Sequence, residues 1–213
     1  MTIYFFLLIH LDAVVVTSGC DKCGACVDLS NKQSAGVILD GNAFSKKPSS
    51  AVSVAVWISL NNTQGMSSIF QAMDDSQTEN MFNLASINGK LHWRHKDKNG
   101  KILFYVKTKE VVVPEALWTH VAATYNSQNG IAKLYVNGLL KQQTTNPKRP
   151  LLSQAWRSGT IGDHLPEHRL FNGLLDEFFM YNWELDPSEI GFVLKYCADH
   201  PKLVSFTVRV PLL

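Results

Sequence analysis

The sequence has few charged residues and no block of charge of one sign. Charged residues make up 18% of the 213 residues, and 20 Lys and Arg stand against 18 Asp and Glu, for a formal net charge of +2. This balance gives no electrostatic support for binding nucleic acid or an acidic membrane surface. Hydrophobic residues reach 46%, which excludes a disordered chain and is enough for one sizeable core.

Common catalytic motifs are also absent. The sequence contains no G-x-S-x-G, no Walker-type glycine loop and no H-E-x-x-H. A retaining glycan hydrolase needs two carboxylates about 5–5.5 Å apart, but Asp176 and Glu177 are adjacent and are expected on opposite faces of a strand. His92 and His95 are three residues apart and are expected on opposite faces too. We therefore expect a protein that is not an enzyme.

No apolar run reaches the roughly 20 residues that cross a bilayer, so we expect no membrane span. Residues 3–16 are mostly apolar and are followed by small residues at 17–19. This pattern predicts a secretory signal peptide over residues 1–19 and a secreted, extracellular protein. A lipoprotein anchored through Cys20 is the alternative, although Asp12 and the lack of a basic residue before Lys22 are atypical of both.

The sequence has only four cysteines, three of which form a C-x2-C-x2-C cluster in a Cys-rich segment over residues 20–36: Cys20, Cys23, Cys26 and the distant Cys197. In a reducing compartment four thiolates can ligate zinc or an iron–sulfur cluster. In a secreted chain an even number of cysteines more often forms disulfides, with three possible pairings for four residues. We expect at least one bridge from the cluster to Cys197, which would make the two ends of the domain neighbours.

β-Branched and aromatic residues fall in short runs separated by Gly, Asn, Ser and Pro, as is typical of an all-β domain. In the run 52–60, apolar residues alternate with mostly small or polar ones. Asn-Gly pairs at 88–89, 129–130 and 137–138 are typical of turns. Further strands are predicted at 67–72, 81–87, 91–95, 102–107, 118–125, 131–136, 139–143, 159–162 and 173–181.

One short helix is predicted near the C-terminus. Asp186 can cap it, Pro187 suits its first turn, and Glu189 completes a capping box. Ten to a dozen strands with this one helix predict an antiparallel two-sheet sandwich or jelly roll.

Five segments together resemble the laminin G-like, concanavalin A-like jelly rolls of the pentraxin-related superfamily. Their order and spacing agree with those of the family patterns. The segments are residues 117–125 (W-x-H-V-A-x-T-Y), 133–138 (L-Y-V-(D/N)-G), 160–162 (I-G), 171–182 (F-x-G-x-I-D-E-x-x-x-Y-N) and 185–190 (L-S-x-x-E-I). The resemblance implies one jelly-roll domain over residues 37–197, followed by a tail at 198–213. It implies a fold and no particular ligand, because this fold serves lectins, adhesion modules and glycan hydrolases alike.

The resemblance also implies a calcium site at the rim of the sandwich. Asp40 and Asn42 belong to a segment similar to the opening D-G of the family, and Asp176 to its D-E strand. Ca²⁺ takes six to eight oxygen ligands, of which these residues would supply part. Asp176 is expected on the same strand face as Phe178 and Met180, where a carboxylate needs a partner. The alternative is that Asp176 accepts backbone N–H groups of the opening loop and no metal binds.

The candidate ligand contacts are aromatic and basic residues in or beside loops. Trp156 and Trp183 are expected to be the more exposed tryptophans, on which a sugar ring can stack. Arg157 is the neighbour of Trp156 and is a further candidate contact. Asn61 begins an N-glycosylation sequon in a predicted loop, as suits a secreted glycoprotein.

We therefore expect a secreted, non-catalytic binding or adhesion module. Its partners would be glycans or extracellular matrix proteins, with mineralised matrix as one setting, and the loops at the rim would form the contact surface. A calcium-dependent, pentraxin-like soluble lectin is the first alternative, and a carbohydrate-active enzyme is the second.

Overall fold

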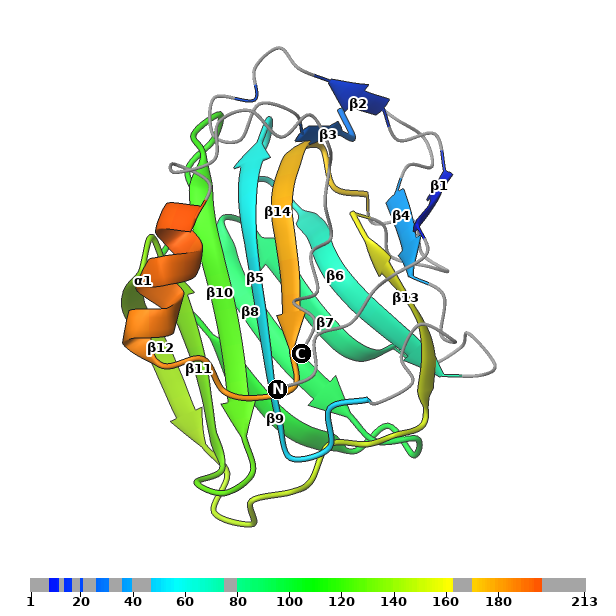
Figure 1. Cartoon of the computed structure of the whole chain (residues 1–213), viewed down its shortest axis with the longest axis vertical. Coiled ribbons are helices and arrows are strands. Elements are labelled where there is room, and N and C mark those ends of the chain that lie inside the picture. Colours follow the sequence, from blue (N-terminus) through cyan, green and yellow to red (C-terminus); the bar gives the residue numbers. More distant parts are fainter. Residues whose placement is uncertain are drawn as a thin grey trace.

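The computed structural model describes residues 8–11, 14–16, 20, 26–30, 36–39, 47–74, 80–162 and 170–196. In this part of the chain two antiparallel sheets of seven strands each pack face to face, and one helix lies against the outside of one sheet (Figure 1). This is the expected all-β sandwich. The described helix is too short to cross a membrane. Four predicted site residues, and the tail at 198–213, lie outside the described residues: Cys23, Asp40, Asn42 and Cys197.

We name the two sheets after their central strands. The β5 sheet has the order β12 (Leu139–Thr145), β11 (Ile131–Val136), β10 (Thr119–Asn126), β5 (Ala51–Leu60), β14 (Gly173–Tyr181), β3 (Cys26–Asp28) and β2 (Val14–Val16). The β6 sheet has the order β1 (Leu8–Leu11), β4 (Gly36–Leu39), β13 (Trp156–Ile161), β6 (Met66–Asp74), β7 (Asn80–Ile87), β8 (Lys90–Lys96) and β9 (Ile102–Lys107).

The alternation predicted in β5 is confirmed, and it builds the core. Val52, Val54 and Val56 belong to the cluster between the sheets, whereas Ala55 belongs to a second cluster on the outer face. All ten residues of β5 are buried, because the outer face of this strand is covered as well. Both faces of β5 therefore contribute to stability through the removal of apolar surface from water.

Aromatic contacts link the two sheets. Phe104 of the β6 sheet stacks on Tyr125 of the β5 sheet, with ring centroids 4.3 Å apart. The Tyr125 hydroxyl donates to the Pro150 carbonyl at 2.6 Å, and burial raises the pKa of Tyr125 to about 12. Phe82 packs against both Trp93 and Trp156. These rings fill the space between the sheets and fix their relative position.

The helix α1 (Pro187–Tyr196) begins at the predicted capping box. The Asp186 carboxylate accepts the backbone N–H groups of Ser188 and Glu189, and the Glu189 carboxylate accepts the N–H of Asp186 at 2.8 Å. Ile190 and Val193 of the helix pack in the outer cluster of the β5 sheet. The capping box thus places a helix over the outer face of β5, β10 and β14.

Two described strands lie inside the predicted signal peptide. β1 pairs with β4, and β2 pairs with β3, each at an edge of its sheet. The structure therefore describes strands within residues 1–19. Their apolar and β-branched residues favour strands, and the open edge of a sheet offers unpaired backbone groups. Among the described strands, β1 pairs only with β4 and β2 only with β3, so cleavage after residue 19 would leave the inner strands paired. The signal peptide stays a prediction.

One disulfide lies within the described residues, and it joins Cys20 to Cys26. The pairing of the other two cysteines falls outside the described residues. Among the described residues the two ends of the domain are brought together by strand pairing, because β3 pairs with β14, with Val27 opposite Leu175. An early strand and the last strand are thus hydrogen-bonded neighbours.

His92 and His95 lie on opposite faces of β8, as predicted. His92 is partly exposed, whereas His95 is fully buried and stacks on Phe82 with ring centroids 3.7 Å apart. The His95 Nε2 atom accepts the Ser153 N–H at 2.9 Å, so its Nδ1–H donates to the Met81 carbonyl at 3.0 Å. Burial lowers the pKa of His95 to about 3. His95 is therefore a neutral core residue that bridges β7 and a loop.

The substitution His95→Phe is expected to lower the free energy of unfolding at pH 7 by about 2 kcal/mol, because two buried backbone groups lose their partner. Wild-type stability should fall as the pH drops from 6.5 towards 3, since the unfolded chain binds a proton near pH 6.5 that the folded imidazole does not bind. The variant should lose less stability over this range. Urea denaturation at pH 7, 5.5 and 4.5 measures both effects.

His92→Phe is the matched control on the opposite face of the same strand. It is expected to change the free energy of unfolding at pH 7 by about 0.5 kcal/mol or less. Equal losses in the two variants would contradict the bridging role of His95.

Candidate functional site

Asp176 lies at an irregularity of β14. It is opposite Trp57 of β5, and the next regular pair along the two strands is Phe179 with Ala55. Two residues of β14 therefore lie opposite one residue of β5, which is a β-bulge. Glu177, in the bulge, has a φ of 47°, a backbone conformation that is uncommon outside glycine. Bulges are frequent beside functional sites, where they change the direction of a side chain.

The bulge corrects one expectation about Asp176. Leu175, Phe178 and Met180 all belong to the core cluster between the sheets, whereas Asp176 does not. The expectation that Asp176 shares a face with Phe178 and Met180 is therefore wrong, because the extra residue shifts the alternation between positions 176 and 178. The carboxylate consequently lies outside the apolar core.

Four neighbouring strands each contribute one residue to a row on the outer face of the β5 sheet. Trp57 is opposite both Asp176 and His120. Continuing the register from the pair Val27–Leu175 places Cys26 across from Asp176. We call this set the outer row, and its members are all buried: Cys26, Asp176, Trp57 and His120, with exposed fractions of 0%, 2%, 8% and 1%.

The outer row contains two ionisable groups with incomplete hydrogen bonding. The Asp176 Oδ1 atom accepts the Glu177 N–H at 2.8 Å, and Oδ2 has no partner among the described residues. Burial, together with the nearby charge of Glu177, raises the pKa of Asp176 to about 7. His120 packs edge-on against Trp57 at 5.3 Å, and neither of its ring nitrogens has a described partner. Burial lowers the pKa of His120 to about 4.

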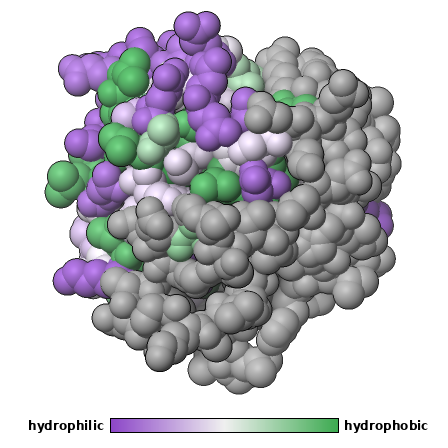
Figure 2. Space-filling model, turned by 90° about the horizontal axis from the view of Figure 1, so that it is seen from above, coloured by the Kyte–Doolittle hydropathy of each residue, from purple (hydrophilic) through white to green (hydrophobic). Residues whose placement is uncertain are grey.

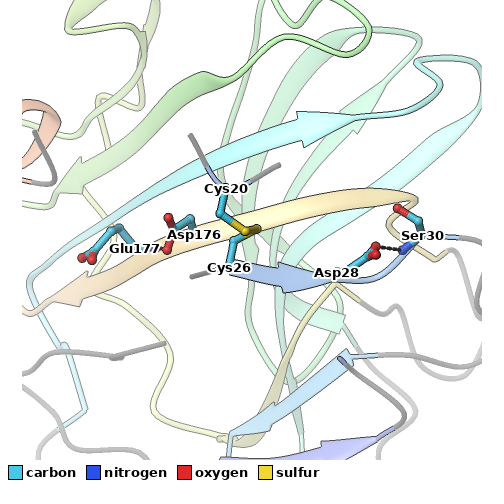
Figure 3. Close-up of a disulfide and its surroundings, with 6 residues drawn as sticks. All are labelled: Cys20, Cys26, Asp28, Ser30, Asp176 and Glu177. Atoms are coloured by element: carbon cyan, nitrogen blue, oxygen red, sulfur yellow. Dashed lines mark hydrogen bonds between the residues drawn. A yellow bond between two sulfur atoms is a disulfide. The ribbon is translucent and has the colours of Figure 1, made fainter. Parts of the chain in front are cut away.

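The surroundings of Asp176 allow a cation but do not complete a site. Figure 3 shows the disulfide over β14, with Asp176 and Glu177 to one side and Asp28, which accepts the Ser30 N–H, to the other. Within the described part of the chain no three His, Cys, Asp or Glu residues are grouped to hold a metal ion. Among the described residues, the Asp176 carboxylate accepts a hydrogen bond from its neighbour Glu177, and the opening loop lies outside the described residues. The Oδ2 oxygen, which has no described partner, is the kind of ligand that Ca²⁺ prefers.

The predicted tryptophan contacts are not exposed as expected. Trp156 is fully buried in the core, so its predicted exposure is wrong, because β13 begins at this residue and directs it between the sheets. The neighbouring Arg157 is exposed. Trp183 is partly buried against the helix, where it contacts Tyr181 at 4.7 Å and donates to the Glu189 carboxylate at 3.3 Å. The three residues therefore do not form one ligand surface.

Asn61 is exposed at the end of β5, as a glycosylation site requires. Its side-chain amide donates to the Ser30 hydroxyl at 2.8 Å and to the Asn172 side chain at 3.2 Å. Thr63 of the sequon donates to the Glu115 carboxylate. Figure 2, which looks onto this end of the molecule, shows hydrophilic residues grouped along its upper edge.

A partly exposed polar face lies on the outer side of β8 and β9, and we call it the β8–β9 face. Its centre is His92, whose Nδ1 atom is 2.7 Å from the Tyr105 hydroxyl. Tyr105 is 38% exposed and lies opposite Arg94, and Lys107 lies opposite His92. Lys90, at the start of β8, completes the set. This face was not predicted from the sequence, although basic residues at every second position of 90–96 are a signal for it.

Comparisons with known proteins agree with this architecture. The laminin G family described as the concanavalin A-like lectin/glucanases superfamily matches residues 31–191. The human adhesion G-protein coupled receptor D1 is 31% identical over 99 residues, which are 45% of this chain and 11% of the receptor. The chain thus spans a small part of that relative.

Solved structures with the same fold include binding domains. The ligand binding domain of botulinum neurotoxin serotype D, in complex with N-acetylneuraminic acid, has a TM-score of 0.68 at 18% identity, covering 91% of this chain and 46% of that chain. Domain 4 of AbnA, an extracellular arabinanase from Geobacillus stearothermophilus, in complex with arabinotriose, has a TM-score of 0.64 at 21% identity, covering 86% and 82%. At these identities the likeness concerns the fold. With its jelly-roll sandwich and the match over residues 31–191, the chain belongs to the concanavalin A-like lectin/glucanase superfamily.

Proposed function

We propose that this chain is a secreted, non-catalytic module that binds glycans through the β8–β9 face. The observation that carries the proposal is the pair His92 and Tyr105, which is hydrogen-bonded at 2.7 Å and accessible on the outer side of a sheet. A tyrosine ring offers apolar area to a sugar face, and its hydroxyl and the imidazole offer hydrogen bonds. Matrix proteins are the other class of partner.

Further features support a binding role outside the cell. The Cys20–Cys26 disulfide is typical of an oxidising compartment. Two of the solved structures with the same fold are complexes with glycans, N-acetylneuraminic acid and arabinotriose. The face lies on regular strands, which hold side chains more rigidly than loops do.

A glycan array probed with the oxidised full-length chain tests the function. We expect binding to a defined set of glycans, and we expect Tyr105→Ala to weaken it at least about tenfold, because the exposed ring and its hydrogen bond are lost.

Leu151→Ala, which removes another large exposed side chain at 67% exposure, is the matched control and should bind like the wild type. Retention of the chain on matrix proteins, without binding to any glycan, would contradict the glycan proposal.

A calcium ion beside Asp176 is a second proposal, and the unpaired Oδ2 oxygen in the bulge favours it. Asp40 and Asn42, which the family resemblance places in the same site, would complete part of the shell. Bound calcium would offset the unfavourable burial of the carboxylate. If calcium binds here, the protein would be a calcium-dependent lectin, which is the first alternative given by the sequence.

Calorimetry of the full chain tests the calcium site. In excess EGTA at pH 7.5, Asp176→Asn should be at least as stable as the wild type, because a neutral amide replaces a buried charge. With calcium at about 100 times its Kd, the wild type should gain about 2.7 kcal/mol and Asp176→Asn should gain nothing.

Glu110→Gln, at an exposed carboxylate, is the control and should respond to calcium like the wild type. A wild-type melting temperature that calcium leaves unchanged would remove the metal site and leave the glycan proposal standing.

A further inference from the structure

Positive charge is concentrated on the β8–β9 face although the whole chain is nearly neutral. Three side chains of β8, Lys90, His92 and Arg94, are partly exposed, and they alternate with buried residues. Lys107 of β9 is exposed beside them. The strands β7, β8 and β9 contain no Asp or Glu at all. The net charge of +2 for the whole chain therefore does not reflect the positive charge of this face.

The basic residues are close enough to act on one ligand. Lys107 is directly opposite His92 on the neighbouring strand, and Arg94 is two positions further along β8. Same-face residues on a strand are about 7 Å apart, and neighbouring strands are about 4.8 Å apart. Burial, followed by the charges of Lys107, Arg94 and Lys90, lowers the pKa of His92. The three cations thus surround one imidazole, and no described carboxylate relieves their mutual repulsion.

The face also contains donors that lack an acceptor. None of Lys90, His92, Arg94 and Lys107 forms an ion pair with a carboxylate of the described residues. The Arg94 Nε atom and the Asn83 side-chain nitrogen are buried without a described hydrogen-bond partner, and Asn83 is opposite Arg94 on β7 with 4% exposure. Buried donors without acceptors are unfavourable. An anionic ligand would instead neutralise the exposed cations of this face, which have no described ion-pair partner.

We propose that the β8–β9 face binds an acidic polysaccharide, through sulfate or carboxylate groups placed between Arg94, Lys107 and Lys90. This inference rests on the proposed glycan-binding function and adds the class of ligand. Charge-assisted hydrogen bonds from guanidinium and ammonium groups to such anions are about twice as strong as neutral ones. A row of cations along a strand matches a linear chain with repeated negative charge better than a single small anion.

A polysaccharide fits this face better than a nucleic acid. Among the described residues of β7, β8 and β9, Tyr105 is the only exposed Phe, Trp or Tyr. Proteins that bind single-stranded nucleic acids place several aromatic rings in a row for successive bases. One ring beside several cations is instead suited to one sugar with its acidic substituents.

The test compares two double variants of the full chain that change the net charge equally. Arg94→Gln with Lys107→Gln alters the proposed site, and Lys148→Gln with Lys195→Gln alters exposed lysines of a loop and of α1. Immobilised dextran sulfate, polygalacturonate and neutral dextran serve as probes in biolayer interferometry at 50 mM and 500 mM NaCl. Equal thermal melting of the variants excludes misfolding as the cause of any difference.

We expect the wild type to bind dextran sulfate or polygalacturonate and not neutral dextran, with weaker binding at high salt because the charges are screened. The site variant should bind about tenfold more weakly or worse, and the control variant should stay within about twofold of the wild type. Binding to only one acidic probe identifies the anion as sulfate or carboxylate, and either result supports the proposal.

Three results would overturn the inference. Equal losses in both double variants would mean that only net charge matters, and tighter binding to single-stranded DNA would assign the face to nucleic acid. Binding of neutral glycans that depends on Tyr105 but not on Arg94 and Lys107 would remove the acidic ligand and keep the proposed function. If no glycan, neutral or acidic, binds the wild type, the proposed function fails together with the inference.

Discussion

The burial of β5 on both faces is the constraint on which the rest of this structure depends. Its inner residues pack between the sheets, and its outer residues need a cover, which α1 provides over Ala55. The cover exists because the chain continues from β14 into the capping box at Asp186. A sheet with one wet face would need no such helix. The last strand and the helix therefore close the β5 sheet as one unit.

The outer faces of the two sheets differ in their exposure to water. On the β5 sheet the outer row is removed from water, and this burial raises the pKa of Asp176 to about 7 and lowers the pKa of His120 to about 4. On the β6 sheet the strands β8 and β9 keep their outer side chains accessible. Buried ionisable groups can respond to a cation, whereas an accessible polar face can bind a large ligand. The two proposed sites, calcium beside Asp176 and glycan on the β8–β9 face, therefore lie on different sheets.

The sequence predicted the parts of the fold that depend on local pattern. Alternation gave β5, turn-type dipeptides gave the hairpin after β7, and the capping box gave α1, because each is decided within a few residues. The bulge at Asp176 was not predictable, since it depends on how β14 pairs with β5 across more than 100 residues of sequence. Trp156 was misjudged for the same reason, because its burial depends on the distant strand β6. Local pattern fixes elements, and pairing between distant strands fixes where their side chains point.

The same limit explains why the basic face was hidden in the composition. Net charge sums over the whole surface, so that acidic residues in distant loops and in α1 cancel Lys90, Arg94 and Lys107 in the total. Screening in water makes these distant charges nearly irrelevant to a ligand on β8, because the Debye length is about 8 Å at physiological ionic strength. A ligand bound to this face would experience mainly the field of the charges nearby. In a sheet, that field is set by the alternation of side chains and by strand register, and both concentrate cations on one side of β8 and β9.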